Sequence, residues 1–117
     1  MDEKLTNKLK EKYPLIFTEN FYFECDNGWY NILDSVCYKI QSYIDDHAPK
    51  VPQIEATQVK EKFGGLRFYF GGGDDFIYEL IHEAERKSTS VCETCGEPGS
   101  IINRRNWLVC RCTACKI

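Results

Sequence analysis

No stretch of this 117-residue sequence approaches the roughly 18 consecutive apolar residues that a membrane-spanning helix requires. Residues 1–8 also lack the apolar segment that forms the centre of a secretory signal. We therefore expect a cytoplasmic protein with no membrane partner.

An excess of positive charge is missing as well. Fifteen Lys and Arg residues stand against 18 Asp and Glu residues, which gives a net charge of −3 and an isoelectric point near 5.4. This balance argues against bulk attraction to nucleic acid, although it leaves room for a local basic patch. The sequence contains no internal repeat, and its 43% hydrophobic content suffices for one packed domain rather than a disordered chain.

Cysteine, by contrast, is abundant and unevenly placed. Five of the seven cysteines fall within residues 92–115, whereas a secreted disulfide scaffold would spread them along the chain. Cys25 and Cys37 stand alone among apolar neighbours, and we expect both to be buried free thiols. The clustering therefore indicates a metal site.

Two cysteine pairs carry the metal signal: Cys92 with Cys95, and Cys112 with Cys115. Together they give the spacing C-x2-C-x16-C-x2-C, which is typical of zinc ribbons. Four thiolates saturate a tetrahedral Zn²⁺ and leave no position for a catalytic water, so the predicted zinc is structural. Cys110 either replaces Cys112 as a ligand or remains a free thiol, and the two-residue spacing favours Cys112.

Apolar periodicity predicts the remaining elements in the order helix, strand, helix, hairpin, helix. Their expected ranges are 2–12, 21–25, 29–47, 56–70 and 75–87. Asp26 or Asn27 is expected to cap the second helix, and Asp74 the third. The predicted fold is α+β, with two main helices flanking a β-hairpin in a domain over 1–88 and a zinc ribbon over 89–117 packed on it.

The hairpin is predicted to turn at Gly64-Gly65, because glycine tolerates the positive φ values of a two-residue turn. This register pairs residue 63 with 66, 61 with 68, and 59 with 70, and it makes one face apolar apart from Glu61. We expect Glu61 either to lie at the margin of the sheet or to have a partner, which would be Arg86, Lys87 or the backbone amides of residues 26–28. The opposite face carries Lys60, Lys62, Arg67 and Tyr69, with Lys62 directly facing Arg67.

This basic face is either an ordinary solvated surface or a contact for phosphates or an acidic protein. A second short hairpin between the two cysteine pairs is expected to present Arg104 and Arg105 at its tip. The charge of a zinc ion with four thiolates offsets the formal +2 of residues 88–117, which weakens a nucleic-acid interpretation there. Glu79 and His82 lie one helical turn apart, a spacing used by metal and catalytic sites but more common on solvated faces.

Several motifs together resemble small proteins encoded by bacteriophages and prophages. They are the run QVKEKFGGLRFY at 58–69, Gly28-Trp29, Asp74-Asp75, Cys92-Glu93-x-Cys95-Gly96 and Trp107. The resemblance spans residues 25–115. In that family the second knuckle is C-x2-C or C-x2-H, which Cys112 and Cys115 match, and Cys110 departs from the pattern. The resemblance implies a phage accessory protein in the host cytoplasm and assigns no catalytic residue.

Three functions follow in order of preference. The first is a protein-binding module that docks on a host protein, for example to inhibit host defence or another host machine. The second is a nucleic-acid-binding zinc ribbon that uses Arg104, Arg105 and Arg111, with Lys60, Lys62 and Arg67 of the first hairpin as further candidates. The third is an enzyme built on Glu79 and His82. We rank this function last and expect the protein to have no catalytic activity.

Overall fold

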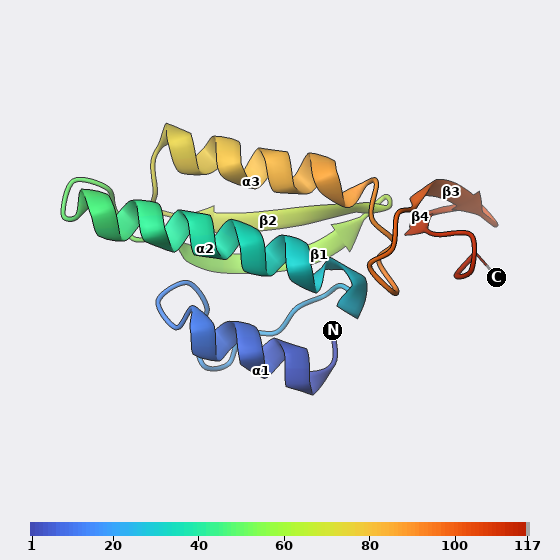
Figure 1. Ribbon diagram of the computed structural model, residues 1–117, viewed down its shortest axis with the longest axis horizontal. Helices are drawn as coiled ribbons and strands as arrows, with labels where there is room; N and C mark the ends of the chain where they lie inside the picture. Colours follow the sequence, from blue (N-terminus) through green and yellow to red (C-terminus); the bar gives the residue numbers. More distant parts are fainter. Residues whose placement is uncertain (117) are drawn as a thin grey trace.

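The computed structural model describes residues 1–116, so the last residue of the predicted ribbon, 117, lies outside the described chain. The predicted α+β class is confirmed (Figure 1). The elements are α1 (Glu3–Lys12), a 3₁₀ turn η1 (Asn27–Trp29), α2 (Tyr30–His47), β1 (Glu55–Lys62), β2 (Gly65–Gly71), α3 (Asp75–Ser88), β3 (Ser100–Arg104) and β4 (Trp107–Arg111).

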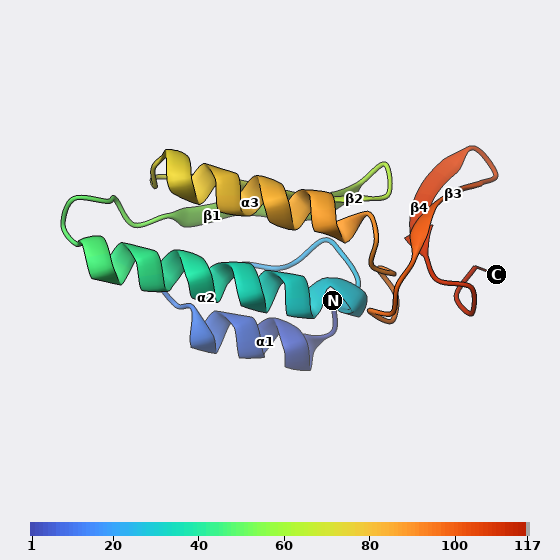
Figure 2. The ribbon, with the colours of Figure 1, turned by 45° about the horizontal axis from the view of Figure 1, so that its top comes forward.

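Three helices and a two-stranded sheet share one core. Figures 1 and 2 show α2 lying between α1 and α3, with α3 running along β2. Trp29, Leu33 and Ile40 at the start and middle of this layer are almost completely buried, as are Val59 and Leu66 on the sheet. The antiparallel β3–β4 hairpin stands at one end of a molecule measuring 48 × 28 × 20 Å.

Side-chain oxygens cap two of the helices. Asp2 accepts a hydrogen bond from the Leu5 amide at the start of α1, and Asp74 accepts one from Ile77 at the start of α3, as predicted for Asp74. The predicted cap of α2 was wrong, since the chain enters this helix through η1 with no side-chain cap.

A polar contact joins α1 to α2. Asp34 accepts hydrogen bonds from Lys12 Nζ at 2.8 Å and from the Tyr13 hydroxyl at 2.6 Å. Burial alone would raise the pKa of Asp34, but these two donors lower it below its ordinary value.

The register of the β1–β2 hairpin differs from the prediction. The turn is Phe63-Gly64, with φ values of 55° and 84°, and Val59 pairs with Phe68 rather than with Phe70. The pairing therefore moves by two residues, and because side chains alternate with a period of two, the apolar face is preserved. Lys60, not Lys62, lies opposite Arg67.

Local contacts explain this turn. Glu61 Oε2 accepts a hydrogen bond from the Gly64 amide at 2.8 Å, so its partner lies within its own hairpin and not on α3 or near residue 26. Gly65 belongs to β2, where an added Cβ would meet the Arg67 guanidinium at 3.1 Å. Phe63, predicted on the apolar face, is instead in the turn and 65% exposed.

Both edges of the sheet are partly covered. Along β2, the amides of Leu66 and Phe68 donate to Ser88 Oγ and Glu85 Oε2 of α3, each at 2.9 Å. Along β1, Glu24 forms a single parallel bridge with Lys60. These contacts satisfy amides that would otherwise be free to pair with another strand.

The predicted strand over 21–25 is absent from this part of the chain, which has only the bridge at Glu24. Its aromatic residues form a cluster instead. Phe17 lies 5.1 Å from Phe21 and 4.9 Å from Phe23, measured between ring centroids. Aromatic content favoured a strand, but ring packing decided the conformation.

Candidate metal centre and binding surfaces

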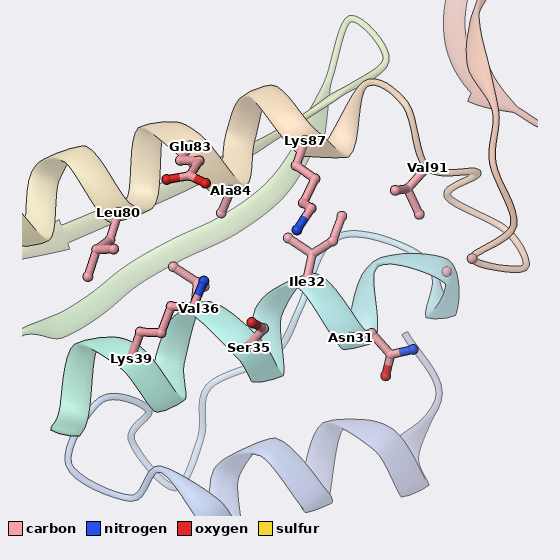
Figure 3. Close-up of a pocket in the computed structure, with 12 residues that line it drawn as sticks. Asn31, Ile32, Ser35, Val36, Lys39, Leu80, Glu83, Ala84, Lys87 and Val91 are labelled. Atoms are coloured by element: carbon pink, nitrogen blue, oxygen red, sulfur yellow. The ribbon is translucent and has the colours of Figure 1, made fainter.

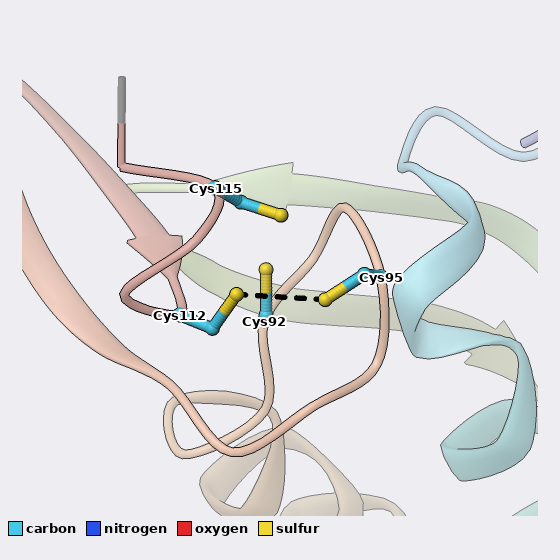
Figure 4. A group of neighbouring side chains, drawn as sticks. All are labelled: Cys92, Cys95, Cys112 and Cys115. Atoms are coloured by element: carbon cyan, nitrogen blue, oxygen red, sulfur yellow. Dashed lines mark hydrogen bonds between the residues drawn. The ribbon is translucent and has the colours of Figure 1, made fainter.

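Four cysteine side chains converge at the end of the molecule that carries β3 and β4 (Figure 4). The Sγ atoms of Cys92, Cys95, Cys112 and Cys115 all lie within 4.8 Å of one another, and Cys95 and Cys112 are 3.5 Å apart. A tetrahedral ion with Zn–S bonds of about 2.3 Å would separate its sulfurs by about 3.8 Å. The spacing therefore suits a metal ion with four thiolate ligands.

Each cysteine pair closes a tight turn of the backbone. In the first, the Gly96 amide donates to the Cys92 carbonyl at 2.9 Å, and Gly96 takes a φ of 87°. In the second, the Cys115 amide donates to the Cys112 carbonyl at 3.2 Å. These turns bring both thiols of a pair to the same side, which is the geometric reason for the two-residue spacing.

The electrostatic environment also favours a cation. Burial would raise the pKa of Cys92, but backbone amides of Cys112, Cys95 and Thr94 outweigh it and lower that pKa to about 6. The neighbouring sulfurs of Cys112 and Cys95 raise the pKa of Cys115 to about 12. Four sulfurs at this distance cannot all ionise unless a cation balances them.

The first knuckle rests directly on the start of α2. The Gly28 amide donates to the Glu93 carbonyl at 2.7 Å, and the Trp29 indole donates to the Val91 carbonyl at 2.9 Å. A Cβ on Gly28 would lie 2.1 Å from the Cys92 carbonyl oxygen. Only glycine permits this approach, so the four-cysteine group is fixed to the helical layer by backbone contact.

A buried carboxylate reinforces the same junction. Glu93 is 6% exposed, and its Oε2 accepts a hydrogen bond from the Asp26 amide at 3.0 Å. Its Oε1 lies 3.4 Å from the Arg111 guanidinium. Burial, the largest influence, raises the pKa of Glu93. Sequence reasoning missed this residue, whose only signal was its place inside the first knuckle.

Cys110 stands outside the four-sulfur group. It is completely buried, and its Sγ lies 3.2 Å from the Val91 carbonyl and 3.4 Å from that of Thr89. Burial raises the pKa of this thiol. Cys25 and Cys37 are buried and free, as predicted.

The predicted basic residues lie on two separate elements. The β1–β2 register places Lys60, Lys62, Arg67 and Tyr69 on the outward face of that hairpin. Lys60 and Arg67 are half-buried, whereas Tyr69 is 44% exposed. Arg104 ends β3 and Arg105 begins the following turn, both exposed, as expected for a hairpin tip.

A groove between α2 and α3 was not anticipated (Figure 3). It encloses about 220 Å³, has an apolar floor that includes Ile32, Val36 and Leu80, and ends against Val91 and Gly96 near the metal centre. Lys39 of α2 and two residues of α3, Glu83 and Lys87, line it, and within residues 1–116 none of the three forms an ion pair. The helical spacing of these residues is visible in the sequence, but locating the groove also requires knowing how α2 and α3 pack against each other.

The Glu79 and His82 pair forms no constellation with other chemical groups in the described residues. Glu79 is exposed, and His82 is half-buried with its ring 4.5 Å from that of Tyr78.

The fold and the site define a small α+β protein with a four-cysteine candidate metal centre. No family model, curated protein or solved structure matches the chain. Within residues 1–116, no helix is both long enough and apolar enough to cross a membrane.

Proposed function

We propose that Cys92, Cys95, Cys112 and Cys115 bind one Zn²⁺ with a structural role. The sulfur geometry supports this, and an all-thiolate tetrahedral donor set is typical of structural zinc. The ion would hold the two knuckles together and so fix the base of β3–β4 against η1. With four protein ligands it would have no open position for substrate.

Elemental analysis of protein purified without chelator tests this assignment. We expect one zinc per chain, and its removal should unfold the C-terminal segment because metal binding supplies folding free energy. Protein that is folded throughout yet contains no zinc or other metal would refute the assignment.

We further propose that the protein is a phage accessory factor that binds a host protein in the host cytoplasm, without catalysing a reaction. The observation that carries this proposal is the α2–α3 groove. An apolar floor beside two lysines and one carboxylate, Glu83, has a net positive rim, which suits an acidic partner segment that inserts an apolar side chain. The resemblance to phage proteins supports a host protein as the partner.

Capture from nuclease-treated host lysate on zinc-loaded protein is the test. The double variant Lys39→Glu/Lys87→Glu should lose the captured protein because it repels an acidic partner. Lys4→Glu/Lys50→Glu makes the same charge change at exposed positions outside the groove and should retain it. Equal capture by the two double variants would refute the groove, and capture that disappears with nuclease treatment would refute a protein partner.

A further inference from the structure

The turn between β3 and β4 lies at one end of the molecule (Figure 2), and its sequence combines cationic and aromatic residues. Arg104 and Trp107 are direct cross-strand partners, so their side chains lie on one face, and Arg105 follows in the turn. Trp107 is 68% exposed, whereas the other tryptophan, Trp29, is completely buried. An indole this exposed beside two arginines makes no contribution to the core.

The hairpin that presents these residues is held at its base. Ile101 and Val109 lie against Gly64 at the tip of β1–β2, and Arg111 pairs with Glu93. This pairing also removes Arg111 from the set of free cations. A ligand at the turn would therefore meet a preorganised arm, which lowers the entropy lost on binding.

The turn itself has a defined conformation. Arg105 and Asn106 take φ values of 53° and 67°, and the Asn106 amide donates to Asn103 Oδ1 at 2.8 Å. Glycine or asparagine normally occupies such positive-φ positions, and arginine there costs free energy. The side chain of Arg105 is exposed at this position.

The thiolate charge of the metal centre does not cancel these arginines. Trp107 and Cys112 are five residues apart along an extended strand, which corresponds to about 17 Å. At physiological ionic strength charges are screened over about 8 Å. The local field at the turn is therefore set by Arg104 and Arg105, despite the net charge of −3.

We propose that this turn is a binding site for single-stranded nucleic acid, separate from the α2–α3 groove. An unpaired base would stack on the Trp107 indole, and Arg104 and Arg105 would each contact a neighbouring phosphate. A duplex is disfavoured because its bases are already stacked and two cations are too few to grip its backbone. This site does not depend on the proposed host-protein interaction.

Tryptophan fluorescence of the zinc-loaded protein provides a direct readout. The probe is a single-stranded oligodeoxythymidine of about 15 nucleotides, within the length that such sites cover. Stacking should quench the emission of Trp107 at low salt, whereas Trp29 is shielded by the core. A blunt duplex of equal length should bind more weakly. Unchanged emission and unchanged anisotropy of the labelled oligonucleotide would overturn the proposal.

Variants assign the contacts by anisotropy. Trp107→Ala should weaken binding about 5- to 150-fold, and Trp107→Tyr should retain most of it. Arg105→Gly keeps the turn geometry and should make the slope of log K against log salt shallower by about 0.7, the value for one phosphate on a single strand. Lys4→Ala, which removes a charge from an exposed position on α1, should leave both affinity and slope unchanged.

Zinc content and melting temperature of each variant establish that the arm remains folded. Trp107→Ala binding the oligonucleotide as tightly as the wild type would overturn the stacking role. If Trp107→Ala instead abolished nuclease-resistant capture of a protein, and no oligonucleotide bound the wild type, the turn would be a protein contact and the proposal wrong.

Discussion

Ser88 is the residue whose truncation should most clearly reveal how α3 supports the sheet. It is completely buried, its Oγ accepts a hydrogen bond from the Leu66 amide at 2.9 Å, and it donates to the Glu85 carbonyl at 2.5 Å. Ser88→Ala leaves the buried Leu66 amide without its acceptor. An unsatisfied buried donor costs about 1–3 kcal/mol.

The better helix propensity of alanine recovers about 0.5 kcal/mol at most, so the net loss of unfolding free energy should be about 0.5–2.5 kcal/mol. In a domain of this size that corresponds to a drop in Tm of about 2–10 °C. Thermal melts and urea titrations of the zinc-loaded protein measure both quantities.

Ser90→Ala is the matched control. Ser90 is exposed two residues beyond Ser88, and the same substitution there should change stability by no more than about 0.5 kcal/mol. If the two variants melted at the same temperature, the contact between α3 and the edge of β2 would contribute nothing to stability, and the reasoning would fail.

Three further outcomes are expected. Cys112→Ser should lose the zinc while Cys110→Ser keeps it in elemental analysis, and the reverse would make Cys110 the ligand. Gly28→Ala, whose Cβ would lie 2.1 Å from a knuckle carbonyl, should lower Tm and zinc affinity together in chelator competition; unaltered affinity would show that the contact does not hold the knuckle. Burial opposes the lowering of the pKa of Asp34, but the hydrogen bonds from Lys12 and Tyr13 outweigh it. The stabilisation that the ionised Asp34 carboxylate gives the folded protein is therefore fully present above the ordinary pKa of aspartate. It is lost as pH falls through the lower pKa that Asp34 has in the folded state. Asp34→Asn should therefore destabilise the protein at about pH 6 and not at about pH 2 in urea titrations, and an equal loss at both would contradict this linkage.

Local signals in the sequence were enough to predict the helices. Apolar residues at three- and four-residue steps located α2 and α3 to within a residue or so, and Asp74 marked the start of α3. The cysteine spacing likewise indicated which thiols would meet, because each pair is closed by a local turn of the backbone.

Features that depend on tertiary contacts were not predictable in the same way. The β1–β2 turn is accompanied by a hydrogen bond from the Gly64 amide to the Glu61 carboxylate, a contact that the sequence pattern does not reveal. The aromatic run at 21–25 had strand-like composition, yet its rings pack on Phe17. The α2–α3 groove exists only through the packing of two helices that are distant in sequence.

The hydrogen bond from Trp29 to Val91 has a practical consequence for dissecting this molecule. Cutting the chain after Ser88 would look natural from the composition of its two parts, but it would leave the indole of a fully buried residue with no acceptor. The same cut would remove Cys110 from behind α3 and Val91 from the end of the groove. A fragment ending at Ser88 is therefore a poor surrogate for the α+β layer, and failed binding by it would say nothing about the intact protein.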